Sequence, residues 1–121
     1  MQIFKRKSTF KLRHLPTWDK IVETMRDKEL NYIDGHTIVD VFYSIDNAHR
    51  FVILKSEDNY LTYSFESLQP YDEEELKYSN DNVFAYWSPG NKSTKSLFDD
   101  MELLMQELTV TPEYKTFFEN R

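Results

Sequence analysis

The sequence contains no cysteine. Without thiols, the chain can form neither a disulfide framework nor a thiolate metal site, so its stability must come from packing, which suits a reducing compartment. The chain also lacks an apolar run long enough to cross a membrane, which takes about 18 residues, and its basic first segment lacks the apolar core of a signal peptide. These absences predict a cytoplasmic protein that does not span a membrane.

Glycine and proline are also scarce, with 2 and 4 residues among 121, whereas 40% of the residues are hydrophobic and 16% are aromatic. This composition is typical of a globular domain and excludes the disordered and fibrous classes. A chain of this length buries one core, and no repeat, low-complexity tract or flexible linker divides it. We therefore predict a single domain over residues 1–121.

Charge is distributed unevenly along the chain. The formal net charge is -6, yet residues 1–15 contain no acid. The cations of that segment are Lys5, Arg6, Lys7, Lys11 and Arg13. The body, residues 16–121, is therefore strongly acidic, which disfavours general nucleic-acid binding and predicts a partner with a basic surface. A nucleic-acid-associated regulator that acts through the basic segment remains an alternative, although the spacing of its lysines also fits the outer face of an edge strand.

An amphipathic helix is predicted near the start of the body. Apolar residues recur at positions i, i+3, i+4 and i+7 from Trp18 to Met25, which is the pattern of a helix with one buried side. Thr17 or Pro16 can begin this helix, and Gly35 lies beyond its end.

Strands are predicted in the middle of the chain. Three runs rich in β-branched and aromatic residues, 36–46, 49–58 and 59–69, are separated by turn residues and indicate an antiparallel meander. In the third run polar and apolar residues alternate, so we expect one sheet face on a core and the other nearer solvent. Residues 83–87 are the expected fourth strand.

Two helices are predicted near the C-terminus. Ser96 is the expected N-cap of the first, with Asp99 at the capping-box position. Its apolar side is formed by Leu97, Met101, Leu104, Met105 and Leu108. Thr111 and Pro112 are expected to begin the second helix. The whole order predicts an α+β fold, in which an antiparallel sheet of about four strands has an N-terminal helix and C-terminal helices packed on one face.

Motifs for catalysis and cofactor binding are largely missing. There is no glycine-rich phosphate loop, no H-E-x-x-H and no G-x-S-x-G element, and the acidic segment 72–82 lacks the central glycine of a calcium loop. A carboxylate could orient His36 or His49 toward a serine nucleophile, whereas His14 lies in the basic segment. A small histidine-dependent enzyme is therefore a further alternative, although turn polarity explains both positions. We expect no catalytic residue, no cofactor and no metal.

The stretch YDEEELKYSNDNVFAYWSPG, residues 71–90, combines acids with large aromatic side chains. Four successive carboxylates repel one another and must at least partly face water, while tyrosine and tryptophan at a surface are typical interface anchors. The candidate contact residues are Asp72, Glu73, Glu74 and Glu75 for electrostatic attraction, and Tyr71, Tyr78, Tyr86 and Trp87 as anchors. The opposing interpretation is that the aromatic side chains fill the core and the acids open a solvated helix.

Residues 50–118 resemble the small cytoplasmic immunity proteins that accompany bacterial polymorphic and contact-dependent toxins. The resemblance is carried by four segments in this order: YLTYSFESLQPYDEEEL, AYWSPG, SLFDDMELLMQEL and PEYKTFF. The resemblance implies a single-domain inhibitor that is encoded beside its toxin, binds that toxin tightly and catalyses no reaction. Together with the acidic body, it predicts a cognate toxin with a basic surface as the partner, no binding to nucleic acid or membrane, and a monomer or weak homodimer.

Overall fold

The computed structural model describes residues 15–30, 35–78, 83–89 and 97–119. The basic segment predicted at the N-terminus therefore lies outside this description except for its last residue. In chain order the elements are α2 (Trp18–Met25), β1 (His36–Tyr43), β2 (His49–Ser56), β3 (Leu61–Pro70), α3 (Glu73–Leu76), β4 (Ala85–Pro89), α4 (Met101–Leu108), α5 (Pro112–Tyr114) and a π-helix, η1 (Lys115–Glu119). No helix among the described residues is long and apolar enough to span a membrane.

The four strands form one antiparallel sheet in the order β1-β2-β3-β4, which confirms the predicted meander. Asparagine in the left-handed region helps to close the two hairpins between the first three strands: Asn47 has a φ of 61° and Asn59 a φ of 70°. Asparagine tolerates this conformation better than most residues. The fourth strand begins at Ala85 and ends at Pro89, slightly later than the predicted run at 83–87.

One core cluster lies between α2 and the sheet. The Thr17 hydroxyl accepts a hydrogen bond from the Lys20 backbone N–H at 3.2 Å and so caps the helix, as predicted. The apolar side of α2 then faces the sheet, except that Trp18 is 40% exposed. The buried members of this cluster are Ile21, Val22, Met25, Ala48, Leu68, Ala85 and Trp87.

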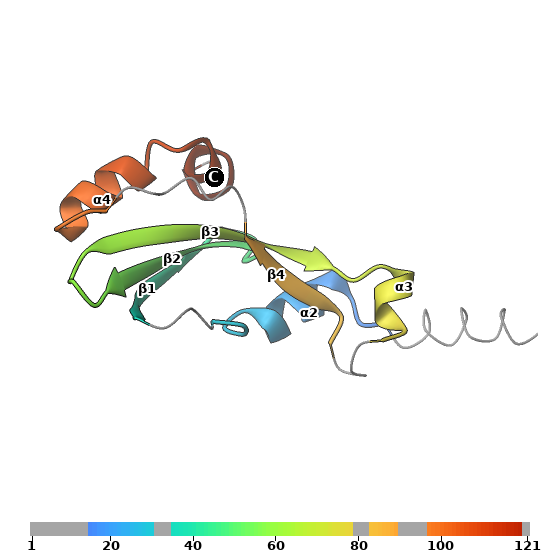
Figure 1. Cartoon of the computed structure of the whole chain (residues 1–121). Coiled ribbons are helices and arrows are strands. Elements are labelled where there is room, and N and C mark those ends of the chain that lie inside the picture. Colours follow the sequence, from blue (N-terminus) through green and yellow to red (C-terminus); the bar gives the residue numbers. More distant parts are fainter. Residues whose placement is uncertain (1–14, 31–34, 79–82, 90–96, 120–121) are drawn as a thin grey trace, which may run out of the picture.

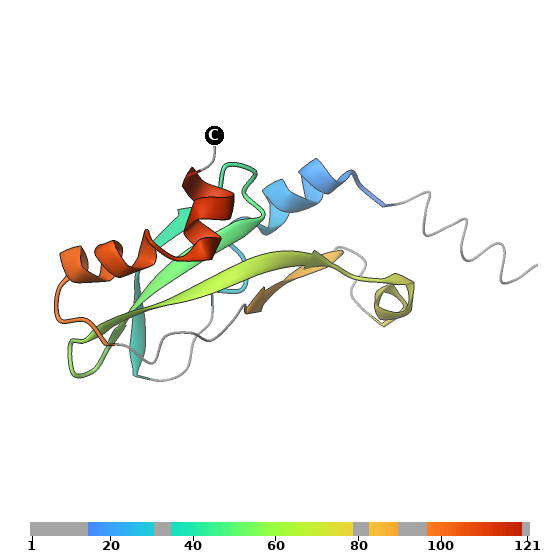
Figure 2. The ribbon, with the colours of Figure 1, turned by 90° about the horizontal axis from the view of Figure 1, so that it is seen from above.

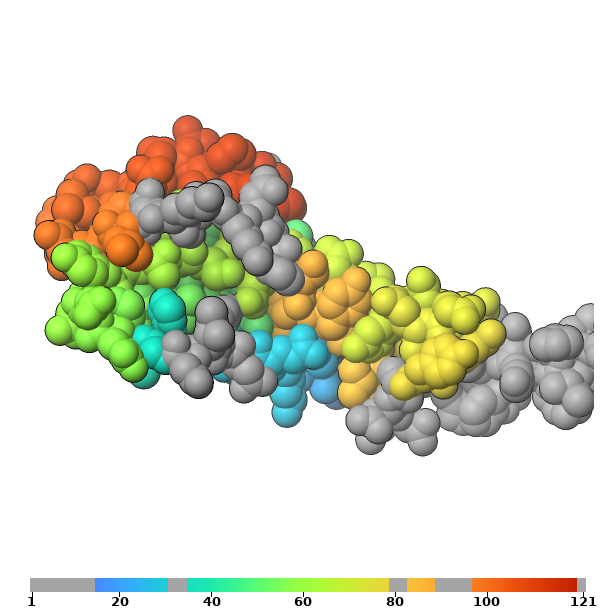
Figure 3. Space-filling view, viewed as in Figure 1, coloured from blue at the N-terminus to red at the C-terminus, as the bar shows by residue number. Residues whose placement is uncertain are grey.

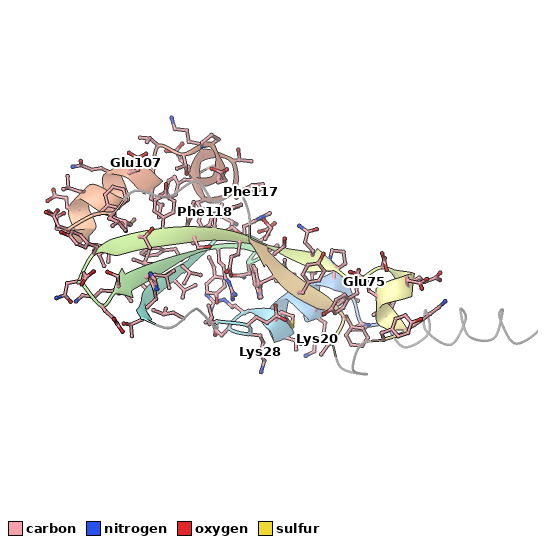
Figure 4. The ribbon with its side chains drawn as sticks, viewed as in Figure 1. Lys20, Lys28, Glu75, Glu107, Phe117 and Phe118 are labelled. Carbon is pink, nitrogen blue, oxygen red and sulfur yellow. The ribbon has the colours of Figure 1, made fainter. Side chains whose placement is uncertain are left out.

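A second core cluster lies under the C-terminal helices. Its buried members are Phe51, Ile53, Leu61, Tyr63, Leu104, Leu108 and Phe118. Phe118 lies on η1, and its ring centroid is 4.9 Å from that of Phe51 on β2. Figure 4 shows Phe117 and Phe118 between η1 and the sheet. Thr111 and Pro112 begin α5 as predicted.

The two clusters lie on opposite faces of the sheet, with α2 below it and α4 above it in Figure 1. The predicted α+β class and the antiparallel sheet are confirmed, and the C-terminal helices share one face, but α2 packs on the other. β2 shows the reason, because Arg50 to Leu54 are buried without a break, as in a strand covered on both sides. In β3, Glu66 and Leu68 are buried on the side of the sheet that α2 covers, which is the face expected nearer solvent.

The helix α4 begins later than predicted. Its N-cap is Asp100, whose Oδ1 accepts a hydrogen bond at 2.8 Å from the backbone N–H of the third helical residue. Phe98 instead pairs with Leu61 through two backbone hydrogen bonds of 2.7 and 2.8 Å, which keeps the preceding chain out of the helix. Leu97 is consequently 61% exposed and not part of the apolar side. The predicted cap Ser96 lies outside the described residues.

A buried arginine fixes the end of α2 against the sheet. Arg50 is fully buried, and its Nε donates to Glu66 Oε1 at 2.6 Å. Its remaining nitrogens donate to the carbonyl oxygens of Arg26, Lys28 and Glu29 at 3.2, 3.0 and 3.2 Å. Arg26 is the C-cap of α2, where carbonyls lack partners within the helix, and Lys28 and Glu29 belong to the segment that follows, so the guanidinium group holds this chain turn against the sheet.

Candidate partner-binding site

The acidic stretch forms a protruding tip at one end of the molecule. β2 begins at His49, which pairs with Ser67, so Leu68–Pro70 of β3 pair only with β4 among the described strands. The short helix α3 follows directly and contains no buried residue. Figures 1 and 2 show α3 at the end of the sheet away from α4, and Figure 3 shows the same segment as a projecting end. We refer to residues 71–78 as the tip.

Two of the four acidic residues predicted to contact a partner hold the backbone of the tip. Asp72 Oδ1 accepts a hydrogen bond from the Glu75 N–H at 2.7 Å, and Glu75 Oε1 accepts one from the Asp72 N–H at 2.9 Å. This reciprocal capping box also brings negative charge to the positive end of the helix dipole. Asp72 and Glu75 therefore shape α3, in addition to any contact they make with a partner.

The other two carboxylates, Glu73 and Glu74, are exposed on the same short helix. Glu74 Oε1 lies 3.8 Å from Lys77 Nζ, but the side chains are 72% and 51% exposed, and ion pairs in solvent are weak. Lys77 is the one cation among the eight residues of the tip, so the local potential is negative. A cationic partner can reach Glu73 and Glu74 without breaking the capping box.

Three tyrosines flank these carboxylates. Tyr71 and Tyr86 form a tilted pair with ring centroids 5.2 Å apart, and both are half-buried. Burial raises the pKa of Tyr71 above its ordinary value, and the charges of Glu29 and Glu75 act in the same direction. Tyr78 is 82% exposed. Tyrosines placed in this way offer apolar contact area together with a polar atom.

Trp87 is placed in the core and not on the surface of the tip. Its side chain belongs to the cluster under α2, and the residue is 7% exposed. The indole Nε1–H donates to the Met25 carbonyl oxygen at 2.8 Å, and the Arg50 guanidinium carbon lies 4.0 Å from the ring centroid. Neighbouring strand residues point to opposite faces, which separates Trp87 from Tyr86. We therefore leave Trp87 out of the contact surface.

Of the two histidines considered for catalysis, His49 lies beneath the C-terminal helices. His49 Nδ1 is 2.8 Å from Ser67 Oγ, and the Phe117 ring stacks on the imidazole with centroids 3.7 Å apart. Burial lowers the pKa of His49 below its ordinary value, and the Asp46 charge partly opposes this shift. His36 is exposed at the start of β1.

Among the described residues, no carboxylate accepts a hydrogen bond from the imidazole that contacts Ser67. Asp46 Oδ1 instead accepts hydrogen bonds from Ser44 Oγ at 2.6 Å and from the Ala48 N–H at 3.1 Å. Two open grooves flank α2, of about 560 and 330 Å³, and neither is lined by His49 or Ser67. This geometry fits packing between the sheet and η1 better than general base catalysis, which needs room for a substrate.

Within the described ranges, no group of three or more histidine, aspartate or glutamate side chains is placed to hold a metal ion. Neither protein-family models nor curated proteins nor solved structures gave a significant match to this chain. The case for a function therefore depends on the geometry of the tip and on the sequence.

Proposed function

We propose that this protein is an immunity protein, a single-domain inhibitor that binds and neutralises a cognate bacterial toxin domain. The observation that carries the proposal is the tip, where Glu73 and Glu74 are exposed near the 82% exposed Tyr78, on a helix with no buried residue. A helix that contributes no buried residue to the core, yet is held by a capping box, is preorganised for contact. The resemblance of residues 50–118 to immunity proteins supports the same function.

The proposed mechanism is coverage of a cationic surface. The negative potential of the tip accelerates encounter with such a surface, and burial of the tyrosines slows dissociation. A toxin domain that acts on nucleic acid needs cations where the phosphates bind. In the complex, the carboxylates of Glu73 and Glu74 occupy phosphate positions and exclude the substrate. This inhibition requires no cofactor and no reaction by the inhibitor.

The function is tested in cells. The reading frame next to the gene of this protein is expressed with and without it, and the protein is used in parallel as bait in a pull-down from its native host. We expect the neighbouring product to be lethal alone, harmless in the presence of this protein, and retained by the bait. If no neighbouring product is toxic and the bait retains no protein, the proposal is wrong, and the histidines and the basic segment become the next sites to test.

A further inference from the structure

The outer edge of β1 is open in the part of the chain that the structure describes. β1 is the first strand of the sheet, so only β2 pairs with it. The Ser44 N–H donates to the His49 carbonyl oxygen at 2.9 Å, and hydrogen-bonded pairs alternate along an antiparallel ladder. Phe42 therefore bonds toward β2, whereas the N–H groups of Val41 and Tyr43 point to the outer edge.

The sequence of β1 favours pairing with a further strand. Thr37, Ile38, Val39 and Val41 are β-branched, and neither proline nor glycine interrupts the strand. Asp40 is its one acidic residue, and the strand contains no lysine or arginine. Segments with high β-propensity and little charge add readily to other strands. An open edge of this composition must be blocked if the chain is to stay soluble.

Asp40 blocks this edge at its centre. Its Oδ1 accepts a hydrogen bond from the Val41 N–H at 2.8 Å, which occupies an outward donor that an added strand would need. The register with β2 shifts between Ile38 and Asp40, so that Val39 bulges and is 45% exposed. The carboxylate itself is exposed, and an added strand would have to remove its water. Bulges and edge charges both discourage strand addition.

The same chemistry occupies an outward N–H of β4. The Tyr71 N–H donates to the Phe84 carbonyl oxygen at 2.9 Å, and the alternation from this pair turns the Trp87 N–H outward. Glu29 Oε1 accepts a hydrogen bond from that N–H at 2.8 Å. Pro89 is the next outward position and has no N–H to donate. A carboxylate therefore occupies an outward N–H in both edge strands.

We propose that Asp40 is a gatekeeper, which prevents β1 from pairing with β1 of a second copy of this chain. Without the carboxylate, two copies join antiparallel through β1 and continue the sheet across the dimer. The inference does not depend on the proposed function. It does bear on how a partner is recognised, because an occupied N–H in each edge strand disfavours strand addition and so favours side-chain surfaces such as the tip as the means of contact.

The substitution Asp40→Ala tests the proposal, since it removes both the charge and the acceptor. We expect sedimentation velocity to show a monomeric wild-type protein and an Asp40→Ala variant that dimerises as its concentration rises. Circular dichroism should show that the variant is folded, because Asp40 is exposed. Hydrogen exchange then locates the contact: the Val41 amide should exchange about fivefold faster in dilute variant than in wild type, and slow as dimers form.

Asp58→Ala is the matched control. Asp58 is an exposed acid in the turn between β2 and β3, and its removal changes the net charge by the same amount. We expect this variant to remain monomeric. The gatekeeper role is refuted if Asp40→Ala stays monomeric with wild-type exchange at Val41, if Asp58→Ala associates equally, or if association protects amides outside β1.

Discussion

At the residue scale, His49 makes stability depend on pH. Its imidazole packs under Phe117, and burial lowers the pKa of His49 below the ordinary value of 6.5. The unfolded chain therefore takes up a proton at a higher pH than the folded protein does. The contribution of His49 to the free energy of unfolding is fully present above pH 6.5, and it is lost as the pH falls through the lower pKa of the folded state.

The substitution His49→Gln should remove this dependence while it keeps a polar group opposite Ser67. We expect the loss of stability between about pH 7 and about pH 5, measured by urea unfolding, to be smaller in the variant than in wild type. His36→Gln is the control, because that side chain is exposed at the start of β1. Equal pH dependence in wild type and His49→Gln would contradict the assignment.

The pair of Arg50 and Glu66 should dominate stability among the charged residues. Glu66→Gln leaves the guanidinium group buried without its counter-charge, and breaking such a pair costs about 3 kcal/mol in the free energy of unfolding. Glu74→Gln makes the same chemical change in an exposed pair, where we expect a change of less than about 0.5 kcal/mol. Urea unfolding of both variants makes the comparison, and equal stabilities would show that the buried pair is not needed.

The sequence could not reveal the role of Arg50, because its partners are distant along the chain. Glu66 is 16 residues away and the Arg26 carbonyl 24 residues away. A lone cation at the start of a predicted strand is typical of a solvated strand end. Trp87 was equally ambiguous, since tryptophan serves both cores and interfaces, and its burial depends on which face of β4 meets α2.

At the scale of elements, the structure identifies the part of the tip that can be altered without unfolding it. Because Asp72 and Glu75 form the capping box, Glu73→Gln/Glu74→Gln is the informative change. After the toxin partner has been identified, its association rate with this double variant can be measured. We expect that rate to be about tenfold lower than for wild type at low salt, with little change in the dissociation rate. The difference should disappear near 1 M salt, where the Debye length is about 3 Å.

The matched control is Glu102→Gln/Glu107→Gln. Both residues are exposed on α4, at the other end of the molecule, and the change in net charge is the same. Figure 4 shows Glu107 on the upper side of α4, away from the tip. We expect a near wild-type association rate for this variant. If the two double variants bind equally fast, the tip is not the contact surface, although an inhibitory function elsewhere on the chain would stand.

Local signals predicted the elements better than their ends. α2 and the first three strands follow from side-chain periodicity and turn residues, which act within a few positions. The start of α4 was missed because Phe98 is held by Leu61, a contact that sequence spacing does not encode. For the tip, the sequence indicated the acids, but it could not show that Asp72 and Glu75 cap α3 while Glu73 and Glu74 face solvent.

At the scale of the whole molecule, the sheet separates two cores and carries the tip beyond both. The cluster under α2 and the cluster under the C-terminal helices share no buried residue, and α3 belongs to neither. Changes at the exposed positions of the tip should therefore leave both cores intact. This separation is what allows a binding surface to vary with its partner while the scaffold is kept.

The hydrogen bonds that Arg50 and Trp87 make to the end of α2 also have a consequence for biosynthesis. Arg50 follows Arg26 by 24 residues, and Trp87 follows Met25 by 62. Since translation proceeds from the N-terminus, α2 is made before either of these partners, and a helix of eight residues is unstable alone in water. The earliest of the described helices is thus secured only after β4 has been made. A nascent chain that stalls before β4 presents the apolar side of α2 to chaperones.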